Sequence, residues 1–123
     1  REPAIDIKVH IAKGNPKIIQ VIDRRSSELK RMTYVYDLYT GAIVRENLYI
    51  GDELRFSDDQ RELIIEACTI SKKACADLDY ARVDFLIGER GLVFVEITLL
   101  PAGGCMPLRS VEHDHKFYQM MFK

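Results

Sequence analysis

The chain has 123 residues, which is the size of one domain and enough to bury one hydrophobic core. With 47% hydrophobic and 30% charged residues, its composition is that of an ordinary globular protein. The formal net charge of −1 gives no electrostatic reason to expect nucleic acid or an anionic membrane as a partner. No apolar run approaches the roughly 18–20 residues of a membrane span, and three cysteines without zinc-type spacing favour free thiols and a cytoplasmic location.

Alternation of apolar and polar residues predicts strands in the first part of the chain. In residues 4–23 two alternating runs flank a break at Gly14-Asn15-Pro16, which indicates a hairpin. Its first strand places three polar side chains on one face: Asp6, Lys8 and His10. Such a face is either a solvent-exposed edge or part of a site. Arg24 and Arg25 end the second strand, and further strands are predicted at 33–39 and 42–50.

A helix is predicted over residues 58–76. Ser57 and Gln60 have the spacing of a capping box, and acidic residues follow at once. One apolar stripe runs along it, formed by Leu63, Ala67, Ile70, Ala74 and Leu78 and widened by Ile64, Cys68 and Cys75. Both cysteines should therefore be buried and unpaired.

Two apolar strands then flank a tight turn at Glu89-Arg90-Gly91. If these three residues form the loop, with Gly91 in the left-handed position, Asp84 lies opposite Glu96 and Arg82 opposite Thr98. All four polar side chains then share one face. The opposite face should enter a core through Val83, Phe85, Val95 and Ile97.

Two opposed carboxylates repel each other unless a cation lies between them. Oxygen ligands suit Mg²⁺, which usually brings phosphate, and Arg82 is well placed for a phosphate oxygen. Two alternatives stay open. Glu96 lies at a solvated edge while Asp84 pairs only with Arg82, or a two-residue loop shifts the register and places Asp84 opposite Val95.

The last part of the chain holds a Gly/Pro-rich loop at 101–107 and a second predicted helix at 111–122. Cys105 has no basic neighbour in sequence and is not expected to be a nucleophile. His113 and His115 point to different sides of a helix, so a joint metal site is not expected. The fold class is therefore α+β, an antiparallel β-sheet with two helices packed on one face.

Several stretches also share a pattern with a known family. They are Ile5-Asp6-Ile7-Lys8-Val9-His10-Ile11, the run from Gly14 to Val21, Tyr36-Asp37-Leu38, Arg82-Val83-Asp84-Phe85, Glu96-Ile97-Thr98 and Glu112-His113-Asp114-His115-Lys116. Together they resemble the carboxyl-terminal half of the ATP-grasp superfamily, and in particular its TupA-like family, which is linked to teichuronic acid and other surface-polysaccharide synthesis. Most ATP-grasp enzymes carry Asn where Thr98 stands, but a hydroxyl is also a neutral oxygen ligand and the TupA-like subgroup carries Thr.

The resemblance implies a role for particular residues. ATP and Mg²⁺ are the implied cofactors, with Asp84, Glu96 and Thr98 as metal ligands. Arg82 and Arg24 would stabilise the transferred phosphoryl group. Lys8, with Asp6 on the same strand face, and Arg24 would lie beside the nucleotide.

The resemblance further implies that residues 1–123 form a single domain, the carboxyl-terminal half of an ATP-grasp fold, and that an amino-terminal lobe is missing. The implied function is the ATP- and Mg²⁺-binding half of a carboxylate–amine ligase-like enzyme in cell-surface polysaccharide synthesis, inactive in isolation. Expected partners are a nucleotide, a small-molecule or glycan substrate and the other lobe, with a homodimer left open. The alternatives are a non-catalytic remnant or assembly module and an unrelated metal-dependent phosphotransferase.

Overall fold

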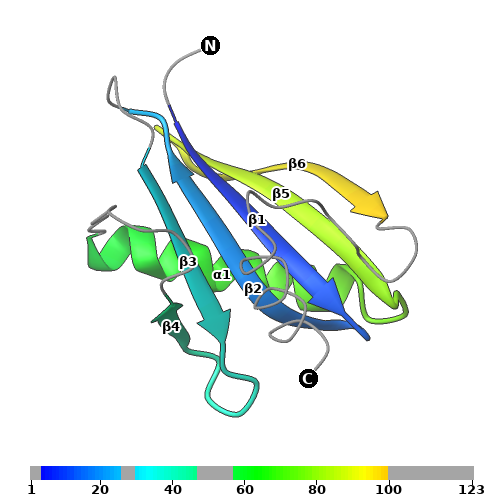
Figure 1. Cartoon of the computed structure of the whole chain (residues 1–123). Coiled ribbons are helices and arrows are strands. Elements are labelled where there is room, and N and C mark those ends of the chain that lie inside the picture. Colours follow the sequence, from blue (N-terminus) through cyan, green and yellow to red (C-terminus); the bar gives the residue numbers. More distant parts are fainter. Residues whose placement is uncertain (1–3, 26–29, 47–56, 100–123) are drawn as a thin grey trace, which may run out of the picture.

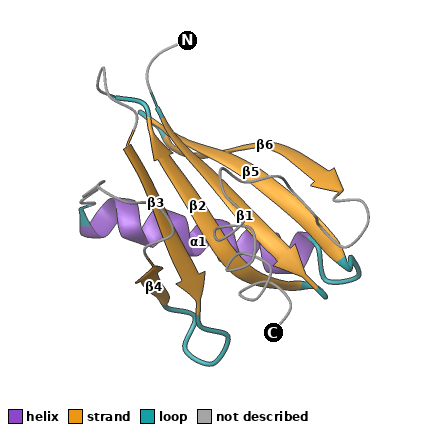
Figure 2. Cartoon of the chain, viewed as in Figure 1, coloured by secondary structure: helices purple, strands orange, loops and turns teal. Residues whose placement is uncertain are grey.

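The computed structural model describes residues 4–25, 30–46 and 57–99. These ranges contain six strands and one helix, in the order β1 (Ile5–Ala12), β2 (Asn15–Asp23), β3 (Lys30–Tyr36), β4 (Ile43–Glu46), α1 (Asp58–Ala74), β5 (Tyr80–Gly88) and β6 (Gly91–Leu99). The strands form one antiparallel sheet in the order β4-β3-β2-β1-β5-β6. α1 runs across one face of this sheet, from the side of β4 towards that of β5 (Figures 1 and 2).

The predicted α+β fold on an antiparallel sheet is confirmed, with one helix rather than two in the described ranges. The second predicted helix, at 111–122, and the loop at 101–107 with Cys105 lie outside the described residues. Within those ranges, no helix combines the length and the apolar character that crossing a bilayer requires.

The hydrophobic core lies between α1 and the sheet. The sheet contributes alternate side chains from five neighbouring strands, β4, β3, β2, β1 and β5, and the inward face of α1 packs on them. Its fully or almost fully buried members include Ile7, Val9, Val21, Met32, Val83 and Phe85 from the sheet and Ile64, Ala67 and Cys68 from α1. This packing leaves the opposite face of the sheet without a helix from the described part of the chain.

The start of α1 follows its sequence signals closely. Ser57 Oγ accepts a hydrogen bond from the Gln60 amide at 3.2 Å, and Gln60 Oε1 accepts one from the Ser57 amide at 3.1 Å. The predicted capping box is therefore confirmed, and two of the amides left unpaired at the helix start find acceptors.

The buried stripe of α1 is narrower than predicted. Ile70 is 40% exposed and Ala74 is exposed, so their predicted burial is wrong. The stripe instead continues through Ser71, whose hydroxyl donates to the Ala67 carbonyl at 2.7 Å and so needs no further partner. Cys68 and Cys75 are buried free thiols as predicted, and burial raises the pKa of Cys68 to about 12.

The β5–β6 hairpin reaches the predicted pairing by a different route. Gly88 pairs with Gly91, so the loop contains only Glu89 and Arg90, and the predicted three-residue loop is wrong. A bulge beside Asp84 then leaves Val95 as an extra residue in β6 and restores the predicted pairing beyond it. Gly91 has the positive φ that was expected, +104°.

Two predicted core positions on β6 are not buried. Val95 is 48% exposed and Ile97 is 39% exposed, whereas Val83 and Phe85 on the neighbouring strand are buried. β6 is the last strand of the sheet, so it has a neighbour on one side only. The bulge also places Val95 in a pocket with polar residues of β1 and β5 rather than in the core.

Candidate functional site

A row of polar residues crosses the sheet on the face opposite α1. The strand pairings place one such residue on each of five neighbouring strands, in the order Thr33, Gln20, Lys8, Asp84 and Glu96. We call this set the polar row. A neighbouring row on the same face contains His10, Arg82 and Thr98, from β1, β5 and β6. Residues remote in sequence thus meet on one surface because alternate side chains of paired strands share a face.

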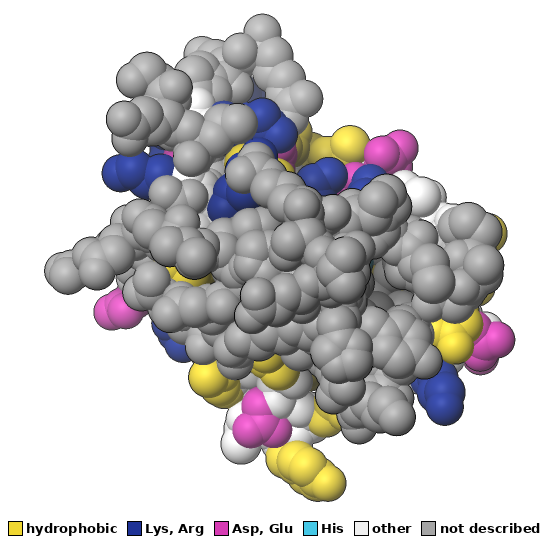
Figure 3. Space-filling view, in the orientation of Figure 1, with side chains coloured by type: hydrophobic (Ala, Val, Ile, Leu, Met, Phe, Trp, Pro, Cys, Tyr) yellow, Lys and Arg dark blue, Asp and Glu magenta, His cyan; other side chains and the backbone are white. Residues whose placement is uncertain are grey.

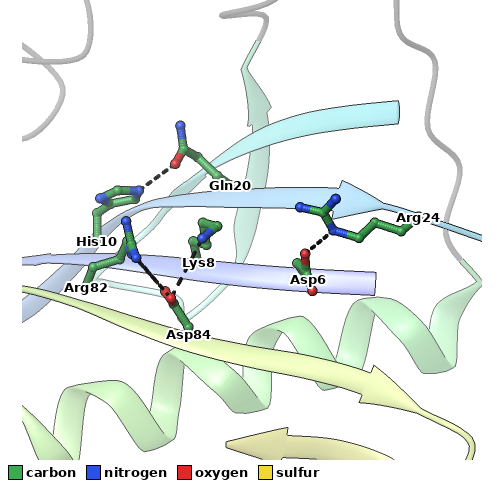
Figure 4. Close-up of polar contacts among 7 residues, drawn as sticks. All are labelled: Asp6, Lys8, His10, Gln20, Arg24, Arg82 and Asp84. Carbon is green, nitrogen blue, oxygen red and sulfur yellow. Dashed lines mark hydrogen bonds and ion pairs between the residues drawn. The ribbon is translucent and has the colours of Figure 1, made fainter. Parts of the chain in front are cut away.

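Asp84 lies at the centre of the charged part of the polar row. Arg82 Nε donates to Asp84 Oδ1 at 2.8 Å, and Arg82 Nη2 donates to Oδ2 at 3.1 Å (Figure 4). Lys8 Nζ lies 3.7 Å from Asp84 Oδ2. The Asp84 side chain is only 12% exposed, so these contacts hold the carboxylate in one orientation within a partly desolvated environment.

Glu96 lies directly opposite Asp84 on β6, and Thr98 lies opposite Arg82, as predicted. Glu96 is exposed, and Asp84 pairs with both Arg82 and Lys8. The structure therefore also agrees in large part with the alternative in which Arg82 neutralises Asp84 and Glu96 lies at a solvated edge. The other alternative, Asp84 opposite Val95, is wrong because of the bulge.

The carboxylates present are few for a metal site made by protein alone. Within residues 4–25, 30–46 and 57–99, no three His, Cys, Asp or Glu side chains form a cluster that could hold an ion. Mg²⁺ in phosphate sites needs only one or two carboxylates, because substrate phosphates and water fill the other positions. Asp84, Glu96 and the Thr98 hydroxyl are therefore a fitting donor set for Mg²⁺ that arrives with a phosphate.

Arg24 pairs with Asp6 at the end of the sheet where β1 begins and β2 ends (Figure 4). Arg25 turns back to Asp23, with Nη2 donating to Oδ2 at 2.8 Å, and this contact lowers the pKa of the Asp23 carboxyl. In the orientation of Figure 1, basic and acidic side chains gather at the upper edge of the molecule (Figure 3). The Arg24 side chain is 45% exposed, so it remains able to reach a ligand.

A small pocket connects the Asp6 end with the Asp84 end. Its volume is about 150 Å³, and its lining includes Asp6, Lys8, Asp84, Leu86 and Val95. Lys8 and Asp6 thus lie beside the same cavity, and the predicted site residues fall into two adjoining groups on one face. This arrangement can hold an anion near Lys8 and Arg82 while the carboxylates face a cation.

Three residues of the same face had no individual predicted role, and only His10 had been placed on that face. His10 is fully buried, and its Nε2 lies 2.7 Å from Gln20 Oε1. Because an amide oxygen only accepts, Nε2 must donate in this hydrogen bond. Gln20 and Thr33 occupy opposite positions on the neighbouring strands β2 and β3. Alternation within β1 predicts which of its own side chains share a face. Gln20 and Thr33 join that face only through the register between strands, which is not visible in the sequence.

The burial of His10 makes the stability of the fold depend on pH. Burial is the main cause that lowers the pKa of His10 from 6.5 to about 4. The unfolded chain therefore binds a proton below about pH 6.5, where the folded chain does not. We expect the free energy of unfolding to fall by about 3 kcal/mol between pH 6.5 and 4 from this residue alone.

Urea unfolding followed by circular dichroism at several pH values measures this dependence. The His10→Asn variant should lack the step between pH 6.5 and 4, although it is less stable throughout. Asp23 and Asp37 do not obscure the result, because carboxyls whose pKa is lowered from 3.8 lose their stabilising effect mainly below that pH. A wild-type chain with constant stability over that interval would show that His10 is accessible to protons in the folded state.

Comparison with known proteins agrees with this arrangement. The chain, whose sheet carries paired cations and carboxylates on the face opposite α1, is an ATP-grasp protein. More narrowly, the chain belongs to the TupA-like ATP-grasp family, because the model of that family matches residues 1–120.

Among solved structures, the D-alanine–D-alanine ligase of Bacillus anthracis is similar to this chain. The sequence identity is 18% and the TM-score 0.48, and the match covers 98% of this chain and 39% of the ligase. The chain thus spans well under half the length of that enzyme. A search of curated proteins gives no match.

Proposed function

We propose that this chain forms the ATP- and Mg²⁺-binding half of a ligase-like ATP-grasp enzyme. The observation that carries the proposal is the position of Asp84, which lies between two cations and opposite Glu96 on the sheet face that points away from α1. Family membership supports the nucleotide as the ligand. The extension to cell-surface polysaccharide synthesis rests on the resemblance to the TupA-like family alone.

Each residue would contribute to the binding of a nucleotide phosphate. Asp84 and Glu96 would hold Mg²⁺, and the Thr98 hydroxyl would complete the donor set. A metal ion held there neutralises phosphate charge and aligns the phosphate oxygens for transfer. Arg82 and Lys8 already lie within 4 Å of Asp84, so their charges are available to phosphate oxygens beside it.

The reaction proposed is the formation of a bond between a carboxylate and an amine. The γ-phosphoryl group passes from ATP to a carboxylate oxygen with release of ADP, and the amine nitrogen then displaces inorganic phosphate from the acyl carbon. The described residues supply no covalent partner in this scheme, so their contribution is positioning and charge stabilisation. Arg24, at the neighbouring strand end, would support the moving phosphoryl group, and its pairing with Asp6 holds it there until a ligand arrives.

The pairing of Asp84 with Arg82 has a consequence for the order of binding. A phosphate that drew Arg82 away would uncover the Asp84 carboxylate for a metal, and Asp84 bound to a metal would leave Arg82 available to phosphate. Metal and phosphate should therefore bind more tightly together than either does alone.

Titration of the ¹⁵N-labelled chain with ATP and Mg²⁺ tests the proposal. We expect weak, millimolar binding, with chemical-shift changes at the amides of Lys8, Asp84 and Glu96. Lys8→Ala should weaken it about tenfold, because a charge-assisted contact to phosphate is lost.

Lys72→Ala is the matched control, because Lys72 lies in the last turn of α1 and is exposed. This change should leave the affinity as it is. Shift changes confined to α1, or equal effects of the two lysine substitutions, would rule out nucleotide binding on the polar face.

A further inference from the structure

The uncharged end of the polar row has properties that the charged end does not explain. Thr33 is 1% exposed, and its Oγ1 has no hydrogen-bond partner in the part of the chain that the structure describes. Leaving a buried hydroxyl unpaired costs about 1–3 kcal/mol, so such a group normally marks the place of a ligand or a bound water. Thr33 lies beside Gln20, and Gln20 lies beside Lys8.

The second observation is a hydrogen bond that holds the Gln20 side chain in place. His10, from the neighbouring strand, donates Nε2–H to Gln20 Oε1 at 2.7 Å, and His10 itself is fully buried. This hydrogen bond to its amide oxygen fixes the direction of the Gln20 amide group (Figure 4). Gln20 is only half-buried, so the polar row remains accessible at this point.

We propose that Thr33 and Gln20 form an uncharged hydrogen-bonding subsite, and that His10 positions Gln20 in it. The subsite takes a hydroxyl or amide group of a molecule whose phosphate or carboxylate lies at Lys8 and Arg82. This inference rests on the proposed function, because that function puts the anion at the charged end.

The spacing of the strands sets the size of the ligand. Neighbouring strands are about 4.8 Å apart, so Gln20 lies about 5 Å and Thr33 about 10 Å from Lys8 along the row. A sugar-sized group joined to one anionic group spans this distance. The ribose of a nucleotide and a polyhydroxylated acceptor carboxylate share that chemistry.

Two pairs of probes separate these sources. Inorganic triphosphate and ATP differ by the nucleoside, and acetate and gluconate differ by the hydroxyl-bearing chain. In each pair the first member reaches only the charged end. Binding of all four to the 123-residue chain is measured by NMR titration in the presence of Mg²⁺.

Thr33→Val is the main variant, because valine keeps the β-branched shape and removes the hydroxyl. It should weaken either ATP or gluconate roughly fivefold and leave triphosphate and acetate unchanged. A loss for ATP assigns the subsite to the nucleotide, and a loss for gluconate assigns it to the acceptor. Thr69→Val, which removes an exposed hydroxyl on α1, should leave all four affinities unchanged.

The positioning role of His10 has its own readout. If His10 acts through Gln20, then His10→Phe, Gln20→Leu and the double variant should weaken the same hydroxyl-bearing probe to the same extent. A merely structural role of His10 would instead give losses that add in the double variant.

The possible failures of the two proposals differ. If Thr33→Val binds all four probes as the parent chain does, Thr33 meets only a water molecule and the subsite is refuted, whatever happens at Lys8. An equal loss for triphosphate and ATP refutes it as well. If the parent chain binds none of the four anions, the proposed function fails and the subsite fails with it.

Discussion

Replacement of Asp84 by Asn should reduce ATP-dependent product formation by roughly 10²–10³-fold, when this chain is joined to the remaining part of an ATP-grasp fold. Asn cannot supply the negative charge that the proposed metal requires. The change also leaves Arg82 and Lys8 without the carboxylate that both now contact. The side chains of Arg82 and Asp84 are 22% and 12% exposed, so solvent replaces that charge poorly.

Other substitutions should follow a graded order in the same assay of ATP consumption at saturating Mg²⁺. Glu96→Gln should match Asp84→Asn, whereas Thr98→Ala should cost less because water can replace a neutral ligand. Lys8→Ala and Arg24→Ala should fall in between, and the isolated 123-residue chain should show no turnover. Asp77→Asn, at an exposed turn after α1, is the control and should be silent.

Unfolding midpoints of the variants separate lost chemistry from a lost fold. If folded Asp84→Asn and Glu96→Gln variants are as active as the parent, the metal site is refuted. A non-catalytic binding or assembly module that kept the fold then becomes the better description of this chain.

The β5–β6 hairpin shows how far local sequence determines a site. Alternation and the glycine at the turn led to the prediction that Asp84 faces Glu96, and this pairing is confirmed. The route was wrong, because the loop is one residue shorter and Val95 supplies the extra residue further along. A bulge depends on how the bulged strand fits its neighbour, and no residue type in β6 predicts one at Val95.

Burial was harder to predict than pairing. Alternation shows which side chains share a face, but it does not show whether a second layer covers that face. Phe85 and Val83 lie beneath α1, while Ile97 on the edge strand remains 39% exposed. Ile70 on α1 is exposed because the helix turns another part of its surface to the sheet.

The candidate site combines strands that the sequence alone could not align. The residues within β5 and β6 were predicted because one short hairpin contains them. Gln20 and Thr33 belong to the same face only through the pairing of β1 with β2 and of β2 with β3. That pairing is a property of the whole sheet, so the uncharged end of the polar row became visible only in three dimensions.

The fold depends on one glycine that lies far from the polar row. Gly14 has φ +76° in the turn between β1 and β2, and its amide donates to the Leu78 carbonyl at 2.9 Å. Lys13 also donates from its amide, to the Asp79 carbonyl at 2.6 Å. These two bonds fasten the β1–β2 turn to the segment that leads into β5. They therefore help to set the register in which Lys8 meets Asp84.

Gly14→Ala should lower the free energy of unfolding by about 2–4 kcal/mol. A methyl group there would overlap the Ala76 carbonyl oxygen and lie 3.1 Å from its carbon, and both atoms belong to the backbone. Backbone atoms cannot turn aside as a flexible side chain can, so either the turn or the segment after α1 must shift. The positive φ adds the cost of holding an L-residue in a left-handed conformation. Urea unfolding of the variant measures the loss.

Two further glycines separate the steric cost from the backbone cost. Gly91→Ala has a positive φ of +104° but no atom within 4 Å of the new methyl group, so it should lose only about 1–2 kcal/mol. Gly88→Ala has open space and no positive φ, and it should change stability by less than about 0.5 kcal/mol. If Gly14→Ala loses no more than Gly91→Ala, the turn does not approach Ala76 closely in solution. The contact that links the first hairpin to β5 would then contribute little to the register of the site.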